Sequence, residues 1–170
     1  MWRVVLIELI VPKGIRSRRA LALAAAAALL AVLAGCAKVP LVGGKPAAKL
    51  TLTATADCNS CDKGAGYPLT LRLLQVTDAS ALTGTTLVQL WDREDKLLGG
   101  AFVSKSEDVV DPGTRKEWKV ELDSKTKAVV VVGNFCKAGG SCWYLVKPVK
   151  GGGVSLKLAL EASCLREAKR

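Results

Sequence analysis

Short stretches in which apolar and polar residues alternate recur along the chain from residue 50 onward, and they constrain the fold more than any other feature. From Leu50 to Ala56, leucine or alanine alternates with threonine, as in a β-strand that buries one face. Turn-forming segments such as Asp111-Pro112-Gly113-Thr114 separate these stretches. The predicted strands lie within residues 50–56, 68–76, 102–103, 109–110, 118–122, 128–132, 142–146 and 154–160. Short strands with turns between them predict an all-β protein built as a β-sandwich.

Two segments depart from the pattern of half-buried strands. The run from Ala128 to Val132 is continuously apolar and β-branched, which predicts a central strand covered on both faces. From Asp78 to Trp91, apolar residues recur at roughly helical spacing, and Asp78 is the expected N-cap. The sequence therefore predicts one short helix, which Gly84 shortens or breaks.

An apolar run of fifteen residues, 20–34, follows three arginines near the start of the chain. A basic segment, a short apolar run and small residues before a cleavage point indicate a bacterial secretory signal peptide. The run is shorter than the roughly 20 residues that span a bilayer. It ends in Leu33-Ala34-Gly35-Cys36, which resembles the lipobox of bacterial lipoproteins, whose cysteine receives a diacylglycerol. We therefore expect a covalent lipid on Cys36; the alternative is an ordinary signal peptide followed by a chance cysteine.

These features divide the sequence into three parts. Residues 1–35 are the expected signal peptide, and their apolar beginning favours a translation start near Val11. Residues 36–49 hold two prolines and a glycine pair and are expected to form a lipidated tether. Residues 50–170 are enough for one β-sandwich domain with its own core. Ala37, where an aspartate would favour the inner membrane, favours the periplasmic face of the outer membrane.

The composition argues against an enzyme, a metal site and a nucleic-acid-binding protein. The chain has no histidine, the commonest general base and transition-metal ligand. The net charge of +10 falls to +6 (20 − 14) without residues 1–35, and the remaining charges are scattered. Asp92, Glu94 and Asp95 stand together, but the cations beside them are typical of a solvated loop or helix end. Neither catalytic residues nor metal ligands are therefore expected.

Five cysteines follow Cys36, and in an exported protein cysteines form disulfides. They are Cys58, Cys61, Cys136, Cys142 and Cys164. The spacing favours two short bridges, Cys58 to Cys61 and Cys136 to Cys142, with Cys164 left over; cross-pairing of Cys164 is the alternative. The Cys58 and Cys61 pair also has the spacing of a redox motif, so a periplasmic thiol-redox or metal-handling lipoprotein is an alternative function.

Several short motifs stand in the order and spacing of a known family. They are Pro68 to Val76, Leu87 to Asp92, Leu98-Gly99, Asp111 to Thr114 and the valine strand up to Phe135. In these the chain resembles the outer-membrane lipoprotein of the bacterial type VI secretion system, the TssJ family. The resemblance implies a two-sheet, transthyretin-like sandwich with one short helix. It also implies a structural subunit that tethers the secretion membrane complex to the outer membrane, as an oligomer within the assembled complex.

The resemblance further implies a partner-binding loop, from Asp57 to Tyr67. The family presents the loop between its first two strands to the periplasmic domain of the inner-membrane component. Side chains here that suit recognition are Asp57, Asn59, Asp62, Lys63 and Tyr67. The alternatives are that this segment is only a connection stapled by its own cysteines, or that the chain is a generic ligand-binding sandwich lipoprotein.

Overall fold

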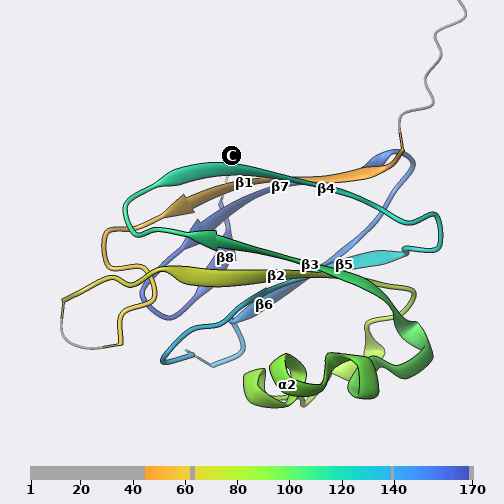
Figure 1. The fold of residues 1–170 in the computed structure, drawn as a ribbon, viewed down its shortest axis with the longest axis horizontal. Coiled ribbons are helices and arrows are strands. Elements are labelled where there is room, and N and C mark those ends of the chain that lie inside the picture. Colours follow the sequence, from red (N-terminus) through yellow and green to blue (C-terminus); the bar gives the residue numbers. More distant parts are fainter. Residues whose placement is uncertain (1–44, 62–63, 139, 169–170) are drawn as a thin grey trace, which may run out of the picture. The chain divides into compact units, whose positions relative to one another are not determined.

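The structure, a computed structural model, describes residues 45–61, 64–138 and 140–168, which form two four-stranded sheets that face each other (Figure 1). Sheet A has the order β4-β1-β7-β8 and sheet B the order β3-β2-β5-β6. Neighbouring strands are antiparallel except β1 and β7, which are parallel. The prediction of a two-sheet, all-β sandwich is confirmed.

The strand bounds follow the predicted alternation, with several differences. The strands are β1 (Ala47–Ala54), β2 (Leu69–Val76), β3 (Phe102–Val110), β4 (Arg115–Glu121), β5 (Ala128–Gly133), β6 (Tyr144–Pro148), β7 (Gly153–Leu160) and β8 (Leu165–Glu167). β1 and β4 each begin three residues before the predicted position, and β6 lies two residues after it. The two predicted segments on either side of Ser104 to Asp108 form one continuous strand. The charged residues between them are tolerated because β3 is the edge strand of sheet B, where the side chains of Lys105 and Glu107 point outward and are exposed. β8 was not predicted.

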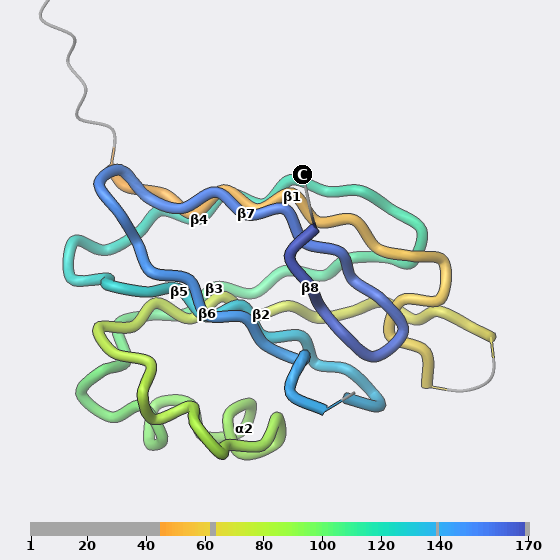
Figure 2. Tube along the Cα trace, turned by 180° about the vertical axis from the view of Figure 1, so that it is seen from behind, coloured from red at the N-terminus to blue at the C-terminus, as the bar shows by residue number. Residues whose placement is uncertain are grey.

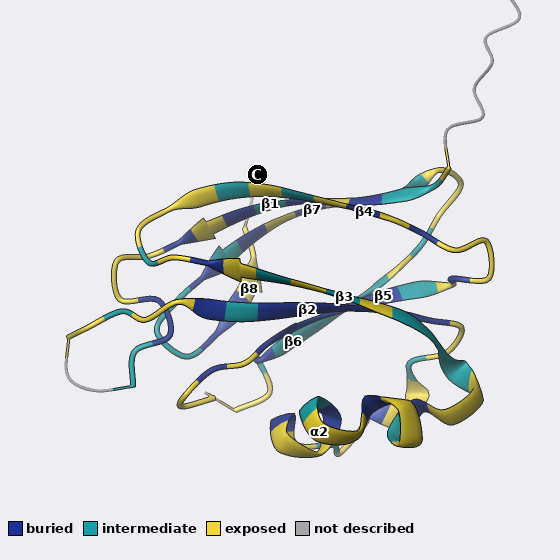
Figure 3. Cartoon of the chain, in the orientation of Figure 1, coloured by how far each residue is buried: buried dark blue, intermediate teal, exposed yellow. Residues whose placement is uncertain are grey.

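The core lies between the sheets and under the helix. In β1, Ala48, Leu50 and Leu52 are buried while the residues between them face outward, so sheet A has one wet face (Figure 3). In sheet B, β2 and β5 are buried along almost their whole length on both faces. The prediction that Ala128 to Val132 is a central strand covered on both faces is confirmed.

The helix α2 (Leu87–Leu98) covers the face of sheet B that points away from sheet A (Figures 1 and 2). It begins later than predicted, because Thr86 and not Asp78 is its N-cap. The Thr86 hydroxyl accepts from the Gln89 N–H at 3.3 Å, and the Gln89 side chain accepts from the Thr86 N–H at 3.0 Å. Asp78 instead accepts from Ser80 at the short 3₁₀ helix η1 (Ser80–Leu82). Gly84, with φ of +78°, separates the two helices.

A buried arginine joins α2 to sheet B. Arg72, on β2, is 7% exposed. Its guanidinium donates to the Trp91 carbonyl at 2.7 Å and to the Glu94 carboxylate at 3.1 Å. It also lies 3.9 Å from the centroid of the Trp91 ring and pairs with Glu107 on β3. The helix is thus held by charge-assisted bonds as well as by the apolar side chains that it buries.

Glu94 corrects one prediction from the sequence. Asp92 and Asp95 are exposed as predicted, but Glu94 is 6% exposed and bonds to Arg72 and Lys105. Burial acts to raise the pKa of the Glu94 carboxyl, but the Lys105 hydrogen bond and the two positive charges outweigh it and lower the pKa. The ionised Glu94 side chain therefore stabilises the folded state fully at a pH above the ordinary carboxyl pKa of about 4.3. This stabilisation is lost as the pH falls through the lower pKa that Glu94 has in the folded protein.

The two ends of the sandwich carry different connections. At one end lie the start of β1, the β4–β5 connection (122–127) and the β6–β7 turn (149–152). Here the Gln75 side chain donates to the Glu121 carbonyl at 2.9 Å and accepts from the Asp123 N–H at 2.8 Å, which ties sheet B to the end of β4. At the other end, the loop end, lie residues 55–61, 64–68, 111–114, 134–138, 140–143 and 161–164.

We expect Arg72→Leu to lower the free energy of unfolding by about 3 kcal/mol, because the buried Glu94 carboxylate loses a cation. The double variant Arg72→Leu/Glu94→Leu should recover most of that loss, since an apolar pair needs no counter-charge. Urea denaturation measures both. As a control, Glu121→Gln removes the exposed Lys45–Glu121 pair and should change stability by less than about 0.5 kcal/mol. Equal losses in the single and double variants would contradict this account.

Candidate functional site

The loop between β1 and β2 (residues 55–68) is the centre of the loop end. Its backbone bonds to the β7–β8 turn, with the Asn59 N–H donating to the Glu161 carbonyl at 3.1 Å and the Ser60 N–H to the Ala162 carbonyl at 2.9 Å. The Tyr67 N–H donates to the Cys58 carbonyl at 2.9 Å and closes the loop on itself. The predicted loop is therefore a folded part of the sandwich end in the residues that the structure describes.

Asn59 is a framework residue of this loop and not part of its surface. It is 4% exposed and has φ of +54°, a left-handed conformation that asparagine tolerates better than most residues. Its side-chain amide donates to the Pro68 carbonyl at 2.9 Å, and its side-chain oxygen accepts from the Cys136 N–H at 2.9 Å. The predicted role of Asn59 in hydrogen bonding to a partner is therefore wrong, because both ends of the side chain are already used inside the protein.

Gly66 packs the second half of the loop against its neighbours. A Cβ atom at this position would lie 2.3 Å from the Ala56 carbonyl oxygen and 2.9 Å from the Pro112 Cβ. Only glycine permits such an approach without a shift of backbone. The Gly113 N–H in the β3–β4 turn also donates to the Thr55 carbonyl at 3.0 Å. The loop is thus fixed on the side of this turn as well, which sequence reasoning did not foresee.

The disulfide pairing differs from the predicted short bridges. Cys61 pairs with Cys136, 75 residues away, and Cys142 pairs with Cys164, 22 residues away. The predicted bridges Cys58 to Cys61 and Cys136 to Cys142 are wrong, and the alternative of a cross-paired Cys164 is confirmed. The reason is tertiary: the Asn59 side chain brings Cys136 to the loop, where the Cα atoms of Cys61 and Cys136 are 5.2 Å apart.

The Cys142–Cys164 bridge joins sheet A to sheet B at the loop end, and the Cys61–Cys136 bridge joins the β1–β2 loop to the segment after β5. Cys142 follows β5 of sheet B, and Cys164 lies in the β7–β8 turn of sheet A, with the Leu165 N–H donating to the Cys142 carbonyl at 2.8 Å. Bridges that close long loops restrict the unfolded chain most. The loop end is therefore the covalently stapled end of the sandwich.

Cys58 is a buried thiol without a disulfide partner. Burial, with a smaller contribution from the charge of Asp57, raises the pKa of this thiol to about 11. The thiol stays protonated at neutral pH, and a protonated buried thiol is a poor nucleophile and a poor metal ligand. Among the described residues, no group of three or more cysteine, aspartate or glutamate side chains is arranged to hold a metal ion.

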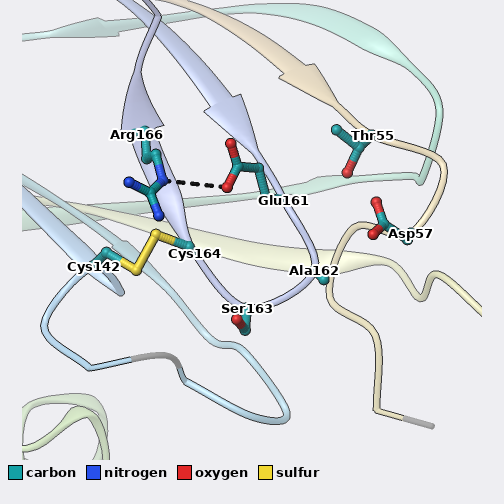
Figure 4. A pocket seen from close by; sticks show the side chains of 8 residues that line it. All are labelled: Thr55, Asp57, Cys142, Glu161, Ala162, Ser163, Cys164 and Arg166. Carbon is teal, nitrogen blue, oxygen red and sulfur yellow. Dashed lines mark hydrogen bonds and ion pairs between the residues drawn. A yellow bond between two sulfur atoms is a disulfide. The ribbon is translucent and has the colours of Figure 1, made fainter. Parts of the chain in front are cut away.

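The surface of the loop end contains a hollow beside the loop (Figure 4). Asp57 borders it from the loop side, and Glu161 faces it from the β7–β8 turn, hydrogen-bonded to Arg166 at 3.2 Å. Tyr67, on the loop itself, is 40% exposed and is one of three large apolar side chains that are exposed among the described residues. Of the predicted recognition residues, Asp57 and Tyr67 thus lie on the surface. Asp62 and Lys63 lie outside the described residues, as does Cys36, the predicted lipidation site.

Comparison with known proteins identifies the fold family. The sequence profile of the type VI secretion lipoproteins (VasD, EvfM, TssJ) matches residues 46–163. The chain belongs to the type VI secretion lipoprotein family. It is a structural lipoprotein and not an enzyme, as the sequence predicted. No curated protein sequence matches the chain.

Solved structures share the fold of this family member. TssJ1, a type VI secretion lipoprotein from Pseudomonas aeruginosa, is 24% identical with a TM-score of 0.67, over 75% of this chain and 98% of that one. Lip from Serratia marcescens, described as a membrane-bound component of the system, is 16% identical with a TM-score of 0.65, over 73% and 98%. A chain in the structure described as the TssM C-terminal domain from EAEC is 15% identical with a TM-score of 0.63, over 74% and 99%.

No helix among the described residues of this lipoprotein is both long and apolar enough to cross a membrane.

We expect Asn59→Ala to destabilise the loop end by about 2 kcal/mol, because the Cys136 N–H and the Pro68 carbonyl lose their partner. Hydrogen exchange should speed up in residues 57–68 before it does in β2 or β5. Asn134→Ala is the matched control, since that asparagine is exposed, and it should change stability by less than about 0.5 kcal/mol. Unchanged exchange in the Asn59→Ala loop would show that the loop is held by its disulfide alone.

Proposed function

We propose that this lipoprotein is anchored by a lipid on Cys36 to the periplasmic face of the outer membrane and binds the periplasmic domain of the inner-membrane component of the secretion complex. It thereby tethers the membrane complex to the outer membrane. The partner surface is the loop end, with Asp57, Asp62, Lys63 and Tyr67 as contact residues. The observation that carries the proposal is that the loop end and the start of β1 lie at opposite ends of the sandwich.

This separation suits a protein that links two layers. The chain from Cys36 enters the domain at Lys45, directly before β1, and the partner loop follows the last residue of β1. β1 is eight residues long, which corresponds to about 26 Å of strand. A lipid at one end and a protein partner at the other can therefore be held at the same time without a clash.

The rigidity of the loop end supports a binding role. The Cys61–Cys136 disulfide and the buried Asn59 side chain order the loop, and the Cys142–Cys164 disulfide fixes the β7–β8 turn that the loop bonds to. Because less conformational entropy is lost on docking, such an ordered loop binds more tightly than a loose connection of equal composition. The 40% exposed Tyr67 is the amphipathic side chain that such interfaces favour.

Family membership and the structural neighbours support the choice of partner. The chain belongs to the type VI secretion lipoproteins, and one chain of the same fold comes from a structure described as the C-terminal domain of TssM. A thiol-redox or metal-handling function has no comparable support, since Cys61 is bound to Cys136 and the remaining thiol is buried.

Changing Cys36 to serine should abolish labelling by a radioactive fatty acid and move the protein from the membrane fraction to the soluble periplasmic fraction. The physical reason is that diacyl and further acyl chains bury enough methylenes for stable anchoring, whereas the described domain offers no spanning helix. The control is Cys58→Ser, which leaves the anchor intact. A Cys36→Ser protein that still floats with outer membranes at high salt would contradict the lipid anchor.

Replacing the exposed residues of the loop end, in the double variant Asp57→Asn/Tyr67→Ala, should weaken binding of the partner's periplasmic domain at least about tenfold. Asn59 and Cys61 are kept, so the frame of the loop survives. Isothermal titration calorimetry measures the Kd, and circular dichroism checks the fold.

The matched control is Val88→Ala/Asp92→Asn, which changes an exposed apolar and an exposed acidic residue on α2 and should leave the Kd unchanged. An unchanged Kd in the loop variant, or an equal loss in the α2 variant, would move the interface away from the loop end.

A further inference from the structure

The outer face of sheet A carries four cations that form no ion pair among the described residues. Because side chains alternate along each strand, the residues between the buried positions of β1, β4 and β7 point away from sheet B. The register sets Lys49 directly opposite Lys119, and it sets Thr51 between Glu117 and Lys157. Arg115 lies opposite Thr53, one row further along. We call Lys49, Arg115, Lys119 and Lys157 the basic face.

The basic face stands out because every other lysine or arginine that lies within a described strand forms an ion pair. Lys45, Arg72, Lys105, Lys116, Lys147 and Arg166 each form an ion pair. The four cations of the basic face are all exposed, and none forms an ion pair among the described residues. Two like charges directly opposite each other on adjacent strands, as Lys49 and Lys119 are, destabilise a sheet. The fold itself gains nothing from this arrangement.

The residues among the four cations are short and polar. Thr51, Thr53 and Ser155 separate the long side chains; Glu117 lies among them, and Glu121, which pairs with Lys45, follows Lys119 on the same side of β4. A hollow lies in the middle of the face, lined by Lys49, Thr51, Glu117, Lys119 and Ser155 together with Leu50 and Trp118. No described helix or loop packs over this face, whereas α2 covers the far side of sheet B (Figures 1 and 2).

We infer that the basic face docks on the phosphate groups of anionic phospholipids in the membrane that holds the lipid anchor. Ammonium and guanidinium groups bind phosphate oxygens by charge-assisted hydrogen bonds. A cluster of lysine and arginine next to a lipid anchor is the arrangement that anionic membrane surfaces attract. This inference rests on the proposed lipid at Cys36.

The length of the tether favours a membrane as the occupant. Eight residues, 37–44, separate Cys36 from Lys45, and even fully extended they reach at most about 29 Å. This is close to the length of β1 itself, about 26 Å for eight residues. Lys49 lies four residues after Lys45 along the chain, so a tether of this length permits the basic face to contact the lipid surface.

The composition of the face argues against an acidic protein as the occupant. Protein interfaces depend on a few large apolar or aromatic anchors in desolvated pockets. The outward positions of β1, β4 and β7 hold only Lys, Arg, Glu, Thr, Ser, Ala and Gly, and Trp118 lies at an inward position opposite Leu50. A flat polar surface with long cationic side chains fits a layer of headgroups better. Docked in this way, the domain lies on its side, with the loop end about 26 Å, the length of β1, from the point at which the chain enters.

The experiment uses the lipidated protein added to preformed vesicles, one set of phosphatidylcholine alone and one with 30% phosphatidylglycerol as a probe of roughly physiological anionic charge. A water-soluble amine-acylating reagent labels the lysines, and mass spectrometry gives the rate at each position. Lys49 and Lys119 should react at least about fivefold more slowly on the anionic vesicles, and high salt should remove the difference. Lys96 on α2 and Lys137 at the loop end should react at the same rate on both.

Two double variants isolate the charge of the face. Arg115→Gln/Lys157→Gln should abolish the protection of Lys49 and Lys119 from acylation, because each cation near an anionic surface raises the equilibrium constant for contact with that surface about fivefold. The control Lys96→Gln/Lys137→Gln removes the same number of charges and should leave the protection of Lys49 and Lys119 intact.

Equal acylation rates on the two kinds of vesicle would overturn the inference, as would protection that survives Arg115→Gln/Lys157→Gln. Protection by the partner's periplasmic domain in place of anionic lipid would also overturn it and assign the face to a protein. Failure of the protein to float with either kind of vesicle would instead refute the lipid anchor.

Discussion

β2 and β5 run through the middle of sheet B with nearly every side chain buried, so neither face of this sheet is left to water. By their alternation, Leu73 and Val131 face sheet A, while Leu74 and Val130 face the opposite side. Sheet A covers the first face, and α2 is required for the second. The one wet surface of the sandwich sheets is then the outer face of sheet A, which is why strongly charged residues gather on that sheet.

Buried polar side chains connect these layers, and each has a separate task. Arg72 holds α2 on sheet B, Gln75 joins sheet B to the end of β4, and Asn59 fastens the first loop to the end of β5. Among the described residues, every buried side-chain nitrogen or oxygen has a hydrogen-bond partner. An unpaired buried polar group would cost free energy. These bonds therefore determine the positions of the helix and loops and also stabilise them.

The covalent staples are concentrated where binding is proposed. Both disulfides among the described residues lie at the loop end, whereas the end at which the chain enters from Cys36 is held by backbone bonds, by Gln75 and by the Lys45–Glu121 ion pair. A stapled end and a flat basic face divide the surface between a protein partner and a lipid layer. The division follows from the topology, since β1 begins at one end and delivers the loop to the other.

Local order in the sequence determined much of this protein. The alternation from Leu50 to Ala56, the apolar run from Ala128 to Val132 and the turn after Asp111 predicted the sandwich, because a strand's periodicity is set by residues that are neighbours in sequence. The helix was foreseen with the wrong start, since the capping pair Thr86 and Gln89 went unrecognised. Residues 1–36 carried the leader and lipobox pattern, which is likewise local.

Only the tertiary structure decided the details of the site. Cys61 meets Cys136 across 75 residues, the Asn59 side chain turns inward, and Glu94 is buried under α2. Lys49 and Lys119, 70 positions apart in the sequence (119 − 49), become direct neighbours through the register of β1 and β4. Each of these depends on which distant segments pack together, and long-range packing is set by the balance of the whole core, not by any short stretch of sequence.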